Sequence, residues 1–234
     1  MMVLYKEPTR PNELDRDIPC RCAIAPVGIV PSQGGSMQVF ATLGPSGSNH
    51  DYVARRYLAF HGLDGAARIE LFPAFPDAFE ALFSGRADYV LKAAVHADAA
   101  RSVALYRDRA PLIDTFLSAS QTMALIMRQK SATSDTLGLQ MATRDYIDIT
   151  RWAKHVLEQT TIDVAHGLLA GKYDAGITLC RFAEEHPAIL EVKEAIGEVL
   201  DPWLVFARTP QPSAGCQIWP DSPAAQRYRD NASP

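Results

Sequence analysis

The segment from Thr42 to His50, TLGPSGSNH, is the part of the chain best suited to bind an anion. A short apolar run ends there in glycine, and small polar residues precede a helical pattern. The free N–H groups and the positive dipole end at such a strand-to-helix junction attract a carboxylate or a phosphate. An ordinary helix N-cap uses the same residue types, so that interpretation stays open as well. The candidate ligand-binding residues of the segment are Ser46, Gly47, Ser48 and Asn49.

His50 and His96 are candidate catalytic residues, because each follows the end of a predicted strand at the start of a helix. In α/β proteins, ligands bind at the carboxyl ends of strands, beside helix N-termini. A histidine at that place can act as a general acid near neutral pH. The alternative for each is a surface or capping histidine with no chemical role.

Three further polar side chains are candidates for substrate binding. Arg144 and Arg181 each follow a predicted strand and precede a predicted helix. A guanidinium at that place can clamp a carboxylate through two parallel hydrogen bonds. Ser120 lies in the run SASQT, at residues 118–122, where the chain would cross between two lobes. Solvated arginines and a polar hinge are the alternatives to these roles.

The sequence carries no motif for a metal or a cofactor. Its six histidines form no H-E-x-x-H pattern, and of its four cysteines only Cys20 and Cys22 are close together, as C-x-C. Zinc sites use C-x-x-C pairs or closely spaced histidines, so we expect no metal. The phosphate-binding patterns G-x-x-x-x-G-K-[ST] and G-x-G-x-x-G are missing, as is the serine-nucleophile pattern G-x-S-x-G. We therefore expect no cofactor.

These candidate residues are positioned by strands that alternate with helices, a pattern typical of α/β proteins with a largely parallel sheet. Pro76 in a first turn and Gly85 just past a last turn support one of the helices. Strands are predicted at residues 39–44, 67–72, 87–95, 111–117, 122–128, 173–179, 189–196 and 202–208. Helices are predicted at residues 45–62, 76–85, 96–108, 144–158, 161–171 and 180–186.

Two clusters of elements predict two lobes with a cleft between them. The stretch before Met37 contains five prolines and a turn-forming run, which predicts an extended arm rather than a helix or a central strand. An alternative is that translation begins at Met37 and that the arm is not native. The predicted parts are an N-terminal arm at 1–36, a first lobe at 37–121 plus about 190–210, a second lobe at 122–189 and a polar tail at 211–234.

The composition is that of a soluble globular protein, with 234 residues, 47% hydrophobic and 21% charged. A net charge of −4 disfavours nucleic acid and anionic membranes as partners. No apolar run reaches the roughly 18 residues of a transmembrane helix, and the first residues contain no apolar core of a secretory signal. We therefore expect a cytoplasmic protein with a small-molecule ligand. The sequence leaves the oligomeric state open, a homodimer included.

Three segments together resemble the catalytic domain of prephenate dehydratases. LGPSGSNHDYVARRY is similar to the family's strand followed by L-G-P-x-G-[ST], and FPAFPDAFEALFSGRADYVL to the stretch that leads to G-x-A-D-Y. TTIDVAHGLLAGKYDAGITL is similar to the S-T-A-E-A-A segment and the strand after it. The resemblance covers about residues 38–208. It implies a two-lobed α/β fold of the type II periplasmic-binding-protein kind, with Thr161 among the substrate-binding residues.

The chain departs from the dehydratases at the residues linked to loss of the ring hydroxyl. Dehydratases carry Thr-Arg-Phe before the last strand, whereas this chain has Asp201-Pro202-Trp203. The turn after G-x-A-D-Y is replaced by KAAVHA, at residues 92–97. Here the chain resembles the non-aromatising prephenate decarboxylases of the bacilysin pathway, which have His-Ala after the third strand and Trp before the last. An ionised Asp201 would also oppose departure of the hydroxyl, because a carboxylate accepts protons and does not donate them.

The resemblance implies a lyase of amino-acid or antibiotic biosynthesis that acts on prephenate, a dicarboxylate with a ring hydroxyl. The expected reaction is non-aromatising decarboxylation to a dihydro-4-hydroxyphenylpyruvate, with His96 or His50 orienting the hydroxyl or supplying the proton. The loop at 46–50 would hold the pyruvyl carboxylate, with Arg144 as a second clamp. Two alternatives stay open: a prephenate dehydratase that forms phenylpyruvate, and a non-catalytic protein of the same fold that binds or senses a small anion.

Overall fold

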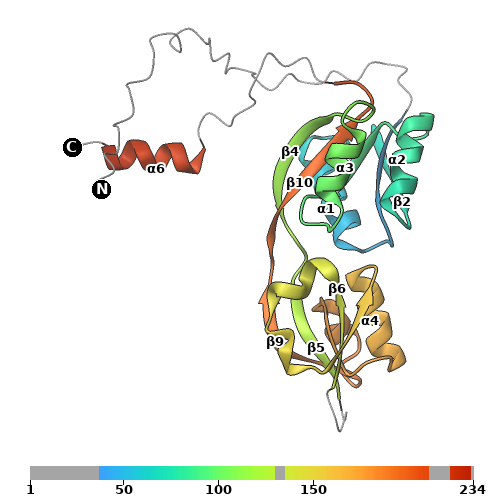
Figure 1. The fold of residues 1–234 in the computed structure, drawn as a ribbon, viewed down its shortest axis with the longest axis vertical. Helices are drawn as coiled ribbons and strands as arrows, with labels where there is room; N and C mark the ends of the chain where they lie inside the picture. The colour runs from blue at the N-terminus through green and yellow to red at the C-terminus, as the bar shows by residue number, and fades with distance from the viewer. Residues whose placement is uncertain (1–36, 130–134, 211–221, 233–234) are drawn as a thin grey trace, which may run out of the picture. The chain divides into compact units, whose positions relative to one another are not determined.

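The computed structural model describes residues 37–129, 135–210 and 222–232. The larger of two separate units, residues 33–212, contains two lobes, each built around its own five-stranded sheet (Figure 1). The predicted arm at 1–36 lies outside the described residues, as do residues 211–221 of the predicted tail. Among the described helices, none combines the length and the hydropathy that a membrane span requires.

The sheet of the first lobe is mixed, with the strand order β2-β1-β3-β10-β4. β1 pairs in parallel with β2 and β3, whereas β10 runs antiparallel to β3 and β4. The prediction of a largely parallel sheet is therefore wrong here, because the chain returns from the second lobe directly into an antiparallel strand. The strands are β1 (Gln38–Leu43), β2 (Ala67–Phe72), β3 (Tyr89–Ala93), β4 (Leu112–Ala119) and β10 (Leu200–Ala207).

Helices pack on both faces of this sheet, and the alternation of side chains along β1 explains why. Phe40 belongs to the apolar cluster that contains Val53 of α1, whereas Val39 and Ala41 belong to the cluster that contains Phe79 of α2. Successive strand residues point to opposite faces, so a strand buried on both sides is apolar throughout. The helices of the lobe are α1 (Asn49–Phe60), α2 (Phe75–Ser84) and α3 (Ala99–Tyr106), close to the predicted positions.

The sheet of the second lobe is also mixed, with the order β7-β6-β8-β5-β9. Tyr173 lies over two glycines of this lobe, and a Cβ atom at Gly138 or Gly167 would come within 2.3 or 2.1 Å of its ring or hydroxyl atoms. The phenol hydroxyl donates a hydrogen bond to Val164 O at 2.9 Å. The elements are β5 (Met123–Arg128), β6 (Thr136–Gln140), β7 (Lys154–Glu158), β8 (Ala175–Leu179), β9 (Leu190–Gly197), α4 (Thr161–Ala170) and α5 (Arg181–Glu185).

The helix predicted at 144–158 does not form. Two 3-10 turns, η2 (Met141–Tyr146) and η3 (Ile149–Arg151), and the edge strand β7 take its place. The Gln140 and Asp148 side chains accept hydrogen bonds from backbone N–H groups two residues further on, which favours turns over a continuous helix. The apolar residues of this segment reach the core of the second lobe from the turns and from β7, so their helical spacing misled the prediction.

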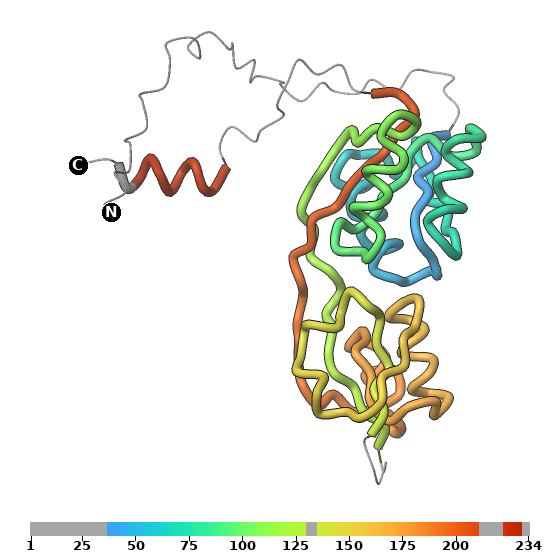
Figure 2. The backbone as a smooth tube through the Cα atoms, in the orientation of Figure 1, coloured from blue at the N-terminus to red at the C-terminus, as the bar shows by residue number. Residues whose placement is uncertain are grey.

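The chain crosses between the lobes twice, at residues 120–122 and 198–199 (Figure 2). The Ser120 N–H donates to Val199 O at 2.8 Å, and the Val199 N–H donates to Ser120 Oγ at 3.0 Å. These reciprocal hydrogen bonds tie the two crossings together as a hinge. The Ser120 hydroxyl is thereby committed to the hinge.

The second crossing falls later than the sequence analysis predicts. The sequence analysis places residues from about 190 in the first lobe, but β9 pairs with β5 in the second sheet. Only β10 returns to the first sheet. β9 lies at one edge of its sheet and only one of its eight residues is buried, so hydrophobic patterning alone could not assign it to a lobe.

Helix α6 (Pro223–Ala232) belongs to the smaller unit and is described by itself. The Ser222 hydroxyl accepts from the Ala225 N–H at 3.2 Å, and Pro223 stands at the first helical position. Serine before a helix and proline in its first turn are typical helix-starting residues. The predicted polar tail thus contains a helix that the sequence analysis does not assign.

Candidate functional site

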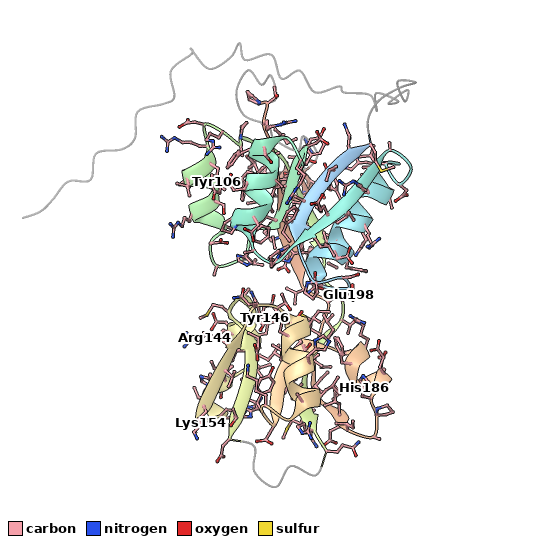
Figure 3. All side chains as sticks on the ribbon, turned by 90° about the vertical axis from the view of Figure 1, so that its right-hand side faces the viewer. Tyr106, Arg144, Tyr146, Lys154, His186 and Glu198 are labelled. Carbon is pink, nitrogen blue, oxygen red and sulfur yellow. The ribbon has the colours of Figure 1, made fainter. Side chains whose placement is uncertain are left out.

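A cavity of about 70 Å³ lies between the lobes, at the carboxyl ends of β1 and β3 and at the N-termini of α1 and α4. Figure 3 shows Tyr146 at the end of the second lobe that faces the first. The first lobe contributes Leu43, Ser48, Asn49, His50, Ala93, Val95, His96, Asp201 and Trp203. The second lobe contributes Met123, Gln140, Ala142, Thr143, Tyr146, Gln159, Thr160 and Thr161.

The N-terminus of α1 presents backbone donors to this cavity. Ser48 is its N-cap, and the Ser48 hydroxyl and carbonyl accept from the N–H groups of Asp51 and Tyr52. The first four N–H groups of a helix have no partner within the helix. The N–H groups of Asn49 and His50 are therefore left for a ligand at the positive end of the α1 dipole.

The N-terminus of α4 repeats this arrangement from the second lobe. Thr160 is its N-cap in a reciprocal capping box with Asp163, and Thr160 O accepts from the Val164 N–H at 3.2 Å. The N–H groups of Thr161 and Ile162 are again left over. Two helix N-termini thus meet at one cavity, each with a pair of backbone donors that suits one carboxylate.

His50 forms one wall of the cavity and is held in its neutral form. Its ring packs edge-on against Phe75 and Trp203, with centroid distances of 5.3 and 5.1 Å. Burial, and to a smaller extent the neighbouring His96 and Lys92, lower the pKa of His50 to about 3. The Ala93 N–H makes a long hydrogen bond of 3.5 Å to Nε2, which places the ring proton on Nδ1.

His96 lies across from His50, at a ring-centroid distance of 6.1 Å, and is paired with a carboxylate. Its Nδ1 hydrogen-bonds to Asp98 Oδ1. Burial lowers the pKa of His96, Asp98 opposes that effect, and Lys92 adds to it. His96 therefore titrates below its ordinary range and remains able to hold a proton.

Lys92 is the least expected residue of the site, because its side chain is 0% exposed within strand β3. Its ammonium donates to Asp98 Oδ1 and to Ser102 Oγ, the latter at 2.9 Å, and lies 3.9 Å from the Phe75 ring centroid. Burial lowers the pKa of Lys92, and Asp98 opposes that change. A buried ammonium is tolerated only when it is paired in this way.

Asp201 and Tyr146 also line the cavity, one from each lobe. Asp201 is buried, and burial raises its pKa. Burial and the nearby Asp201 raise the pKa of Tyr146 to about 12. This changes the interpretation of Asp201, since a buried carboxyl group binds a proton more readily than an exposed one and can also donate it.

Of the ten residues that the sequence analysis singles out, the structure brings five to the cavity: Ser48, Asn49, His50, His96 and Thr161. The Ser48 hydroxyl is already used as the α1 cap, donating to Leu43 O and accepting from the Asp51 N–H. The Asn49 side-chain oxygen accepts from the Gln121 N–H at 3.0 Å and so joins α1 to the first crossing. These two side chains build the site, and backbone groups are left to bind the ligand.

The other five residues lie elsewhere: Ser46, Gly47, Ser120, Arg144 and Arg181. The Ser46 hydroxyl and the Gly47 N–H both donate to Asp51, at 3.2 and 2.8 Å, and so shape the cap of α1. Arg144 is exposed on η2 and does not line the cavity (Figure 3). The expected arginine clamps are therefore not found, because the segment around Arg144 forms a 3-10 turn instead of a helix.

Arg181 borders a different cavity of about 260 Å³ beside the crossings. Its guanidinium carbon lies 4.6 Å from the Phe182 ring centroid, and Nη1 is 3.4 Å from Glu185 Oε1. The other residues of this cavity are Tyr52, Gln121, Thr122, Leu179, Glu184 and Glu198. Figure 3 shows Glu198 where the chain crosses between the lobes.

Sequence reasoning missed Lys92 and Asp98, although both left a signal. Lys92 is a charged residue inside the apolar run YVLKAAV, and such a residue in a buried strand requires an internal partner. Asp98 follows His96 by two residues, within reach of its ring. The pairing itself depends on the fold, because the chain must turn back after β3 to place Asp98 over Lys92.

We expect Gly47→Ala to lower the stability of the protein without weakening binding at the cavity. Gly47 has a φ of 79°, and a Cβ there would lie 2.9 Å from Arg181 Nη2. A left-handed backbone at a residue with a side chain costs about 1–2 kcal/mol. Denaturant unfolding measures the stability, and titration with prephenate, the ligand that the sequence resemblance implies, measures the binding. Gly62→Ala is the matched control for the left-handed backbone alone, since Gly62 has a φ of 66° but open space around its Cβ position. A large loss of affinity with unchanged stability would return Gly47 to the binding site.

Among the described residues, no group of three or more histidine, cysteine or acidic side chains is placed to hold a metal ion. His50, His96 and Asp98 lie near one another, but Asp98 is committed to Lys92 and His96. The chemistry that these residues can perform is proton transfer and hydrogen bonding in a small, partly apolar space.

Comparison with solved structures identifies the fold. A prephenate dehydratase from Arthrobacter aurescens, in complex with L-Phe, is similar with a TM-score of 0.53 and 21% identity over 81% of this chain and 69% of that chain. The periplasmic VFT2 domain of Bordetella pertussis BvgS gives a TM-score of 0.45 and 16% identity over 73% and 80% of the two chains. Arginine-bound, truncated ArgBP from T. maritima gives 0.44 and 14% over 74% and 88%.

No protein-family model matches the sequence, and comparison with curated proteins gives no match. At these identities the structural likeness shows the fold alone. The chain has a two-lobed α/β fold similar to that of the prephenate dehydratase structure, with its cavity between the lobes.

Proposed function

We propose that this protein is a prephenate lyase that decarboxylates prephenate without aromatising its ring. The observation that carries the proposal is the convergence of two helix N-termini with a His96–Asp98–Lys92 chain at one cavity. The fold shared with a prephenate dehydratase and the motif resemblance of residues 38–208 support it.

Binding would use helix N-termini in place of arginines. Prephenate has a ring carboxylate and a pyruvyl carboxylate, and the cavity offers one pair of backbone N–H groups on α1 and one on α4. Each helix N-terminus carries roughly half a positive charge. Among the described residues that line the cavity there is no arginine or lysine, so these dipoles and the lining hydroxyl and amide groups would supply the attraction.

The reaction releases carbon dioxide from the ring carbon that carries the carboxylate. The electron pair of the broken C–C bond moves through one ring double bond to the carbon next to the hydroxyl-bearing carbon. A proton added there gives the dihydro-4-hydroxyphenylpyruvate, so that prephenate and one proton yield the product and one carbon dioxide. If the same electrons instead expel the hydroxyl as water, the ring becomes aromatic and phenylpyruvate forms. Which product forms therefore depends on whether the acid of the site lies close to that ring carbon or to the hydroxyl.

We assign His96 as the general acid that donates the proton to the ring carbon. It lines the cavity, and its Nε2 has no hydrogen-bond partner among the described residues, because its one hydrogen bond is made by Nδ1. Apolar groups such as Val95 and Trp203 complete the wall around the histidines. Such surroundings disfavour a carboxylate relative to neutral carbon dioxide.

The dehydratase is the second candidate, and Asp201 is the observation that favours it. Dehydration needs an acid at the hydroxyl, and a protonated Asp201 would be one. Asp201 lines the cavity, and burial raises its pKa. An ionised Asp201 would instead accept a hydrogen bond from the hydroxyl, and the substrate would then keep its hydroxyl group.

Incubation with prephenate, followed by proton NMR, tests the proposal. In D₂O the decarboxylation product should carry one deuterium on a ring carbon and keep its hydroxyl-bearing carbon, whereas phenylpyruvate shows aromatic protons. Phenylpyruvate as the main product would identify a dehydratase. Saturable binding with no turnover would identify a binding protein.

We expect the product ratio of the enzyme to depend on pH through Asp201. As pH falls through its raised pKa, the carboxyl group gains a proton and the fraction of phenylpyruvate should rise. Asp201→Asn cannot titrate, so its product ratio should not change with pH. Product ratios at each pH, corrected by a blank without enzyme for aromatisation in solution, measure this. Equal pH dependence in both proteins would contradict the role of Asp201.

A further inference from the structure

We infer that Asp98 and Lys92 are positioning residues that hold the His96 ring in one orientation and one tautomer. The catalytic consequence rests on the proposed function, whereas the positioning itself is a property of the folded chain. Neither residue lines the cavity, so each would act on a substrate only through His96.

A single carboxylate oxygen joins the three side chains. Asp98 Oδ1 hydrogen-bonds to the ammonium of Lys92 and to Nδ1 of His96. Lys92 is fixed in turn by Ser102, whose hydroxyl it contacts at 2.9 Å and which donates to Asp98 O at 3.1 Å. Strand β3 and the first turn of α3 are therefore locked together behind His96.

The charge of Lys92 keeps Asp98 ionised. Burial alone would raise the pKa of Asp98, but the hydrogen bond and charge of Lys92, together with His96, lower it below its usual range. An ionised carboxylate only accepts hydrogen bonds, so Nδ1 of His96 must carry a proton. In the neutral ring Nε2 then has none, and the proton gained on ionisation goes to Nε2.

Of the groups that face His96 from the surrounding elements, Asp98 is the one that can fix the tautomer of its ring. His50 on α1 is neutral, Phe75 on α2 contributes an aromatic ring at 4.9 Å, and Lys92 on β3 is a cation. Within the described part of the chain, Asp98 is thus the one anion in contact with His96. As in other histidines that are oriented by a carboxylate, the hydrogen-bond partner of one ring nitrogen sets the tautomer.

The variants Asp98→Asn, Lys92→Met and the double variant K92M/D98N test the inference in the full chain. Asn keeps the shape of Asp98 and removes its charge. Asp98 stands at the N-cap of α3 without a side-chain capping bond, so the change removes no cap. The double variant leaves no unpaired buried charge and guards against misfolding. Asp108→Asn, at an exposed position just after α3, is the matched control.

The primary measurement is the NMR titration of the His96 ring, with ¹⁵N shifts that report its tautomer. In the wild-type protein and in D108N, neutral His96 should carry its proton on Nδ1. In D98N and K92M/D98N the titration midpoint should move to lower pH and the tautomer should become mixed. An unchanged midpoint and tautomer in both would overturn the inference.

The second measurement is the pH dependence of kcat with prephenate. In D98N we expect kcat to fall about 10- to 100-fold, with KM little changed and the pH profile moved to lower pH. Loss of stability alone would lower the active fraction and leave the profile in place, and that result would overturn the inference. A protein with no turnover but with the expected NMR shifts would refute the proposed function and still support the positioning.

Discussion

Replacing His96 with alanine is expected to slow the proposed decarboxylation of prephenate by about 10²-fold or more, since a positioned general acid contributes at least that factor. The physical reason is that the departing electron pair must be captured by a proton at a ring carbon, and His96 is the titratable cavity residue assigned to deliver it. Single-turnover rates with identified products measure the effect.

The role of His96 also predicts the direction in which activity changes with pH. His96 donates a proton only in its charged form, so activity should be present below its pKa and lost as pH rises through it. Because burial lowers that pKa, with Asp98 opposing, the loss should begin below the ordinary histidine range. His166→Ala, at an exposed position on α4, is the control and should retain both rate and profile. Full activity in His96→Ala would remove this residue from the mechanism and leave His50 as the next candidate.

His50 should make the protein markedly less stable in acid. Its pKa is about 3 in the folded protein and 6.5 when unperturbed, so the unfolded chain binds a proton that the folded chain excludes. Stability is then fully present above pH 6.5 and falls as the pH decreases toward 3. Each pH unit in that interval removes at most about 1.4 kcal/mol, and the whole interval at most about 5 kcal/mol. The value is an upper bound because the ring is only partly buried at the cavity wall.

Comparison of wild type with His50→Gln isolates this contribution, because all other titrating groups are common to both proteins. Denaturant unfolding between pH 7 and 3 should give a difference in free energy of unfolding that shrinks or reverses toward low pH. His166→Gln, at an exposed position of α4, is the matched control variant. Parallel curves for wild type and His50→Gln would show that His50 titrates freely in the folded state.

Local patterns in the sequence were sufficient for most elements of the first lobe. Gly85 takes the left-handed conformation expected past a helix end, with a φ of 80°, and Pro76 lies in the first turn of α2. The strand run VFATL is apolar throughout because β1 is covered on both faces. The spacing of apolar residues predicted a helix at residues 144–158 that does not form. There the Gln140 and Asp148 side chains accept backbone hydrogen bonds and stabilise turns instead.

The alternating α/β pattern, the loop-to-helix junction at Ser48–His50 and the two histidines that follow strand ends could be predicted from the sequence. These features are local, and capping, turn and periodicity rules apply within a few residues. The folded structure was needed to show that β9 belongs to the second sheet and that the N-termini of α1 and α4 point at one cavity. It was also needed to show that Arg144 and Arg181 lie outside that cavity, and that Lys92 contacts Asp98. These residues are far apart in the sequence, and strand order and the two crossings between the lobes bring them together. Strand order and crossings cannot be predicted from any short run of residues.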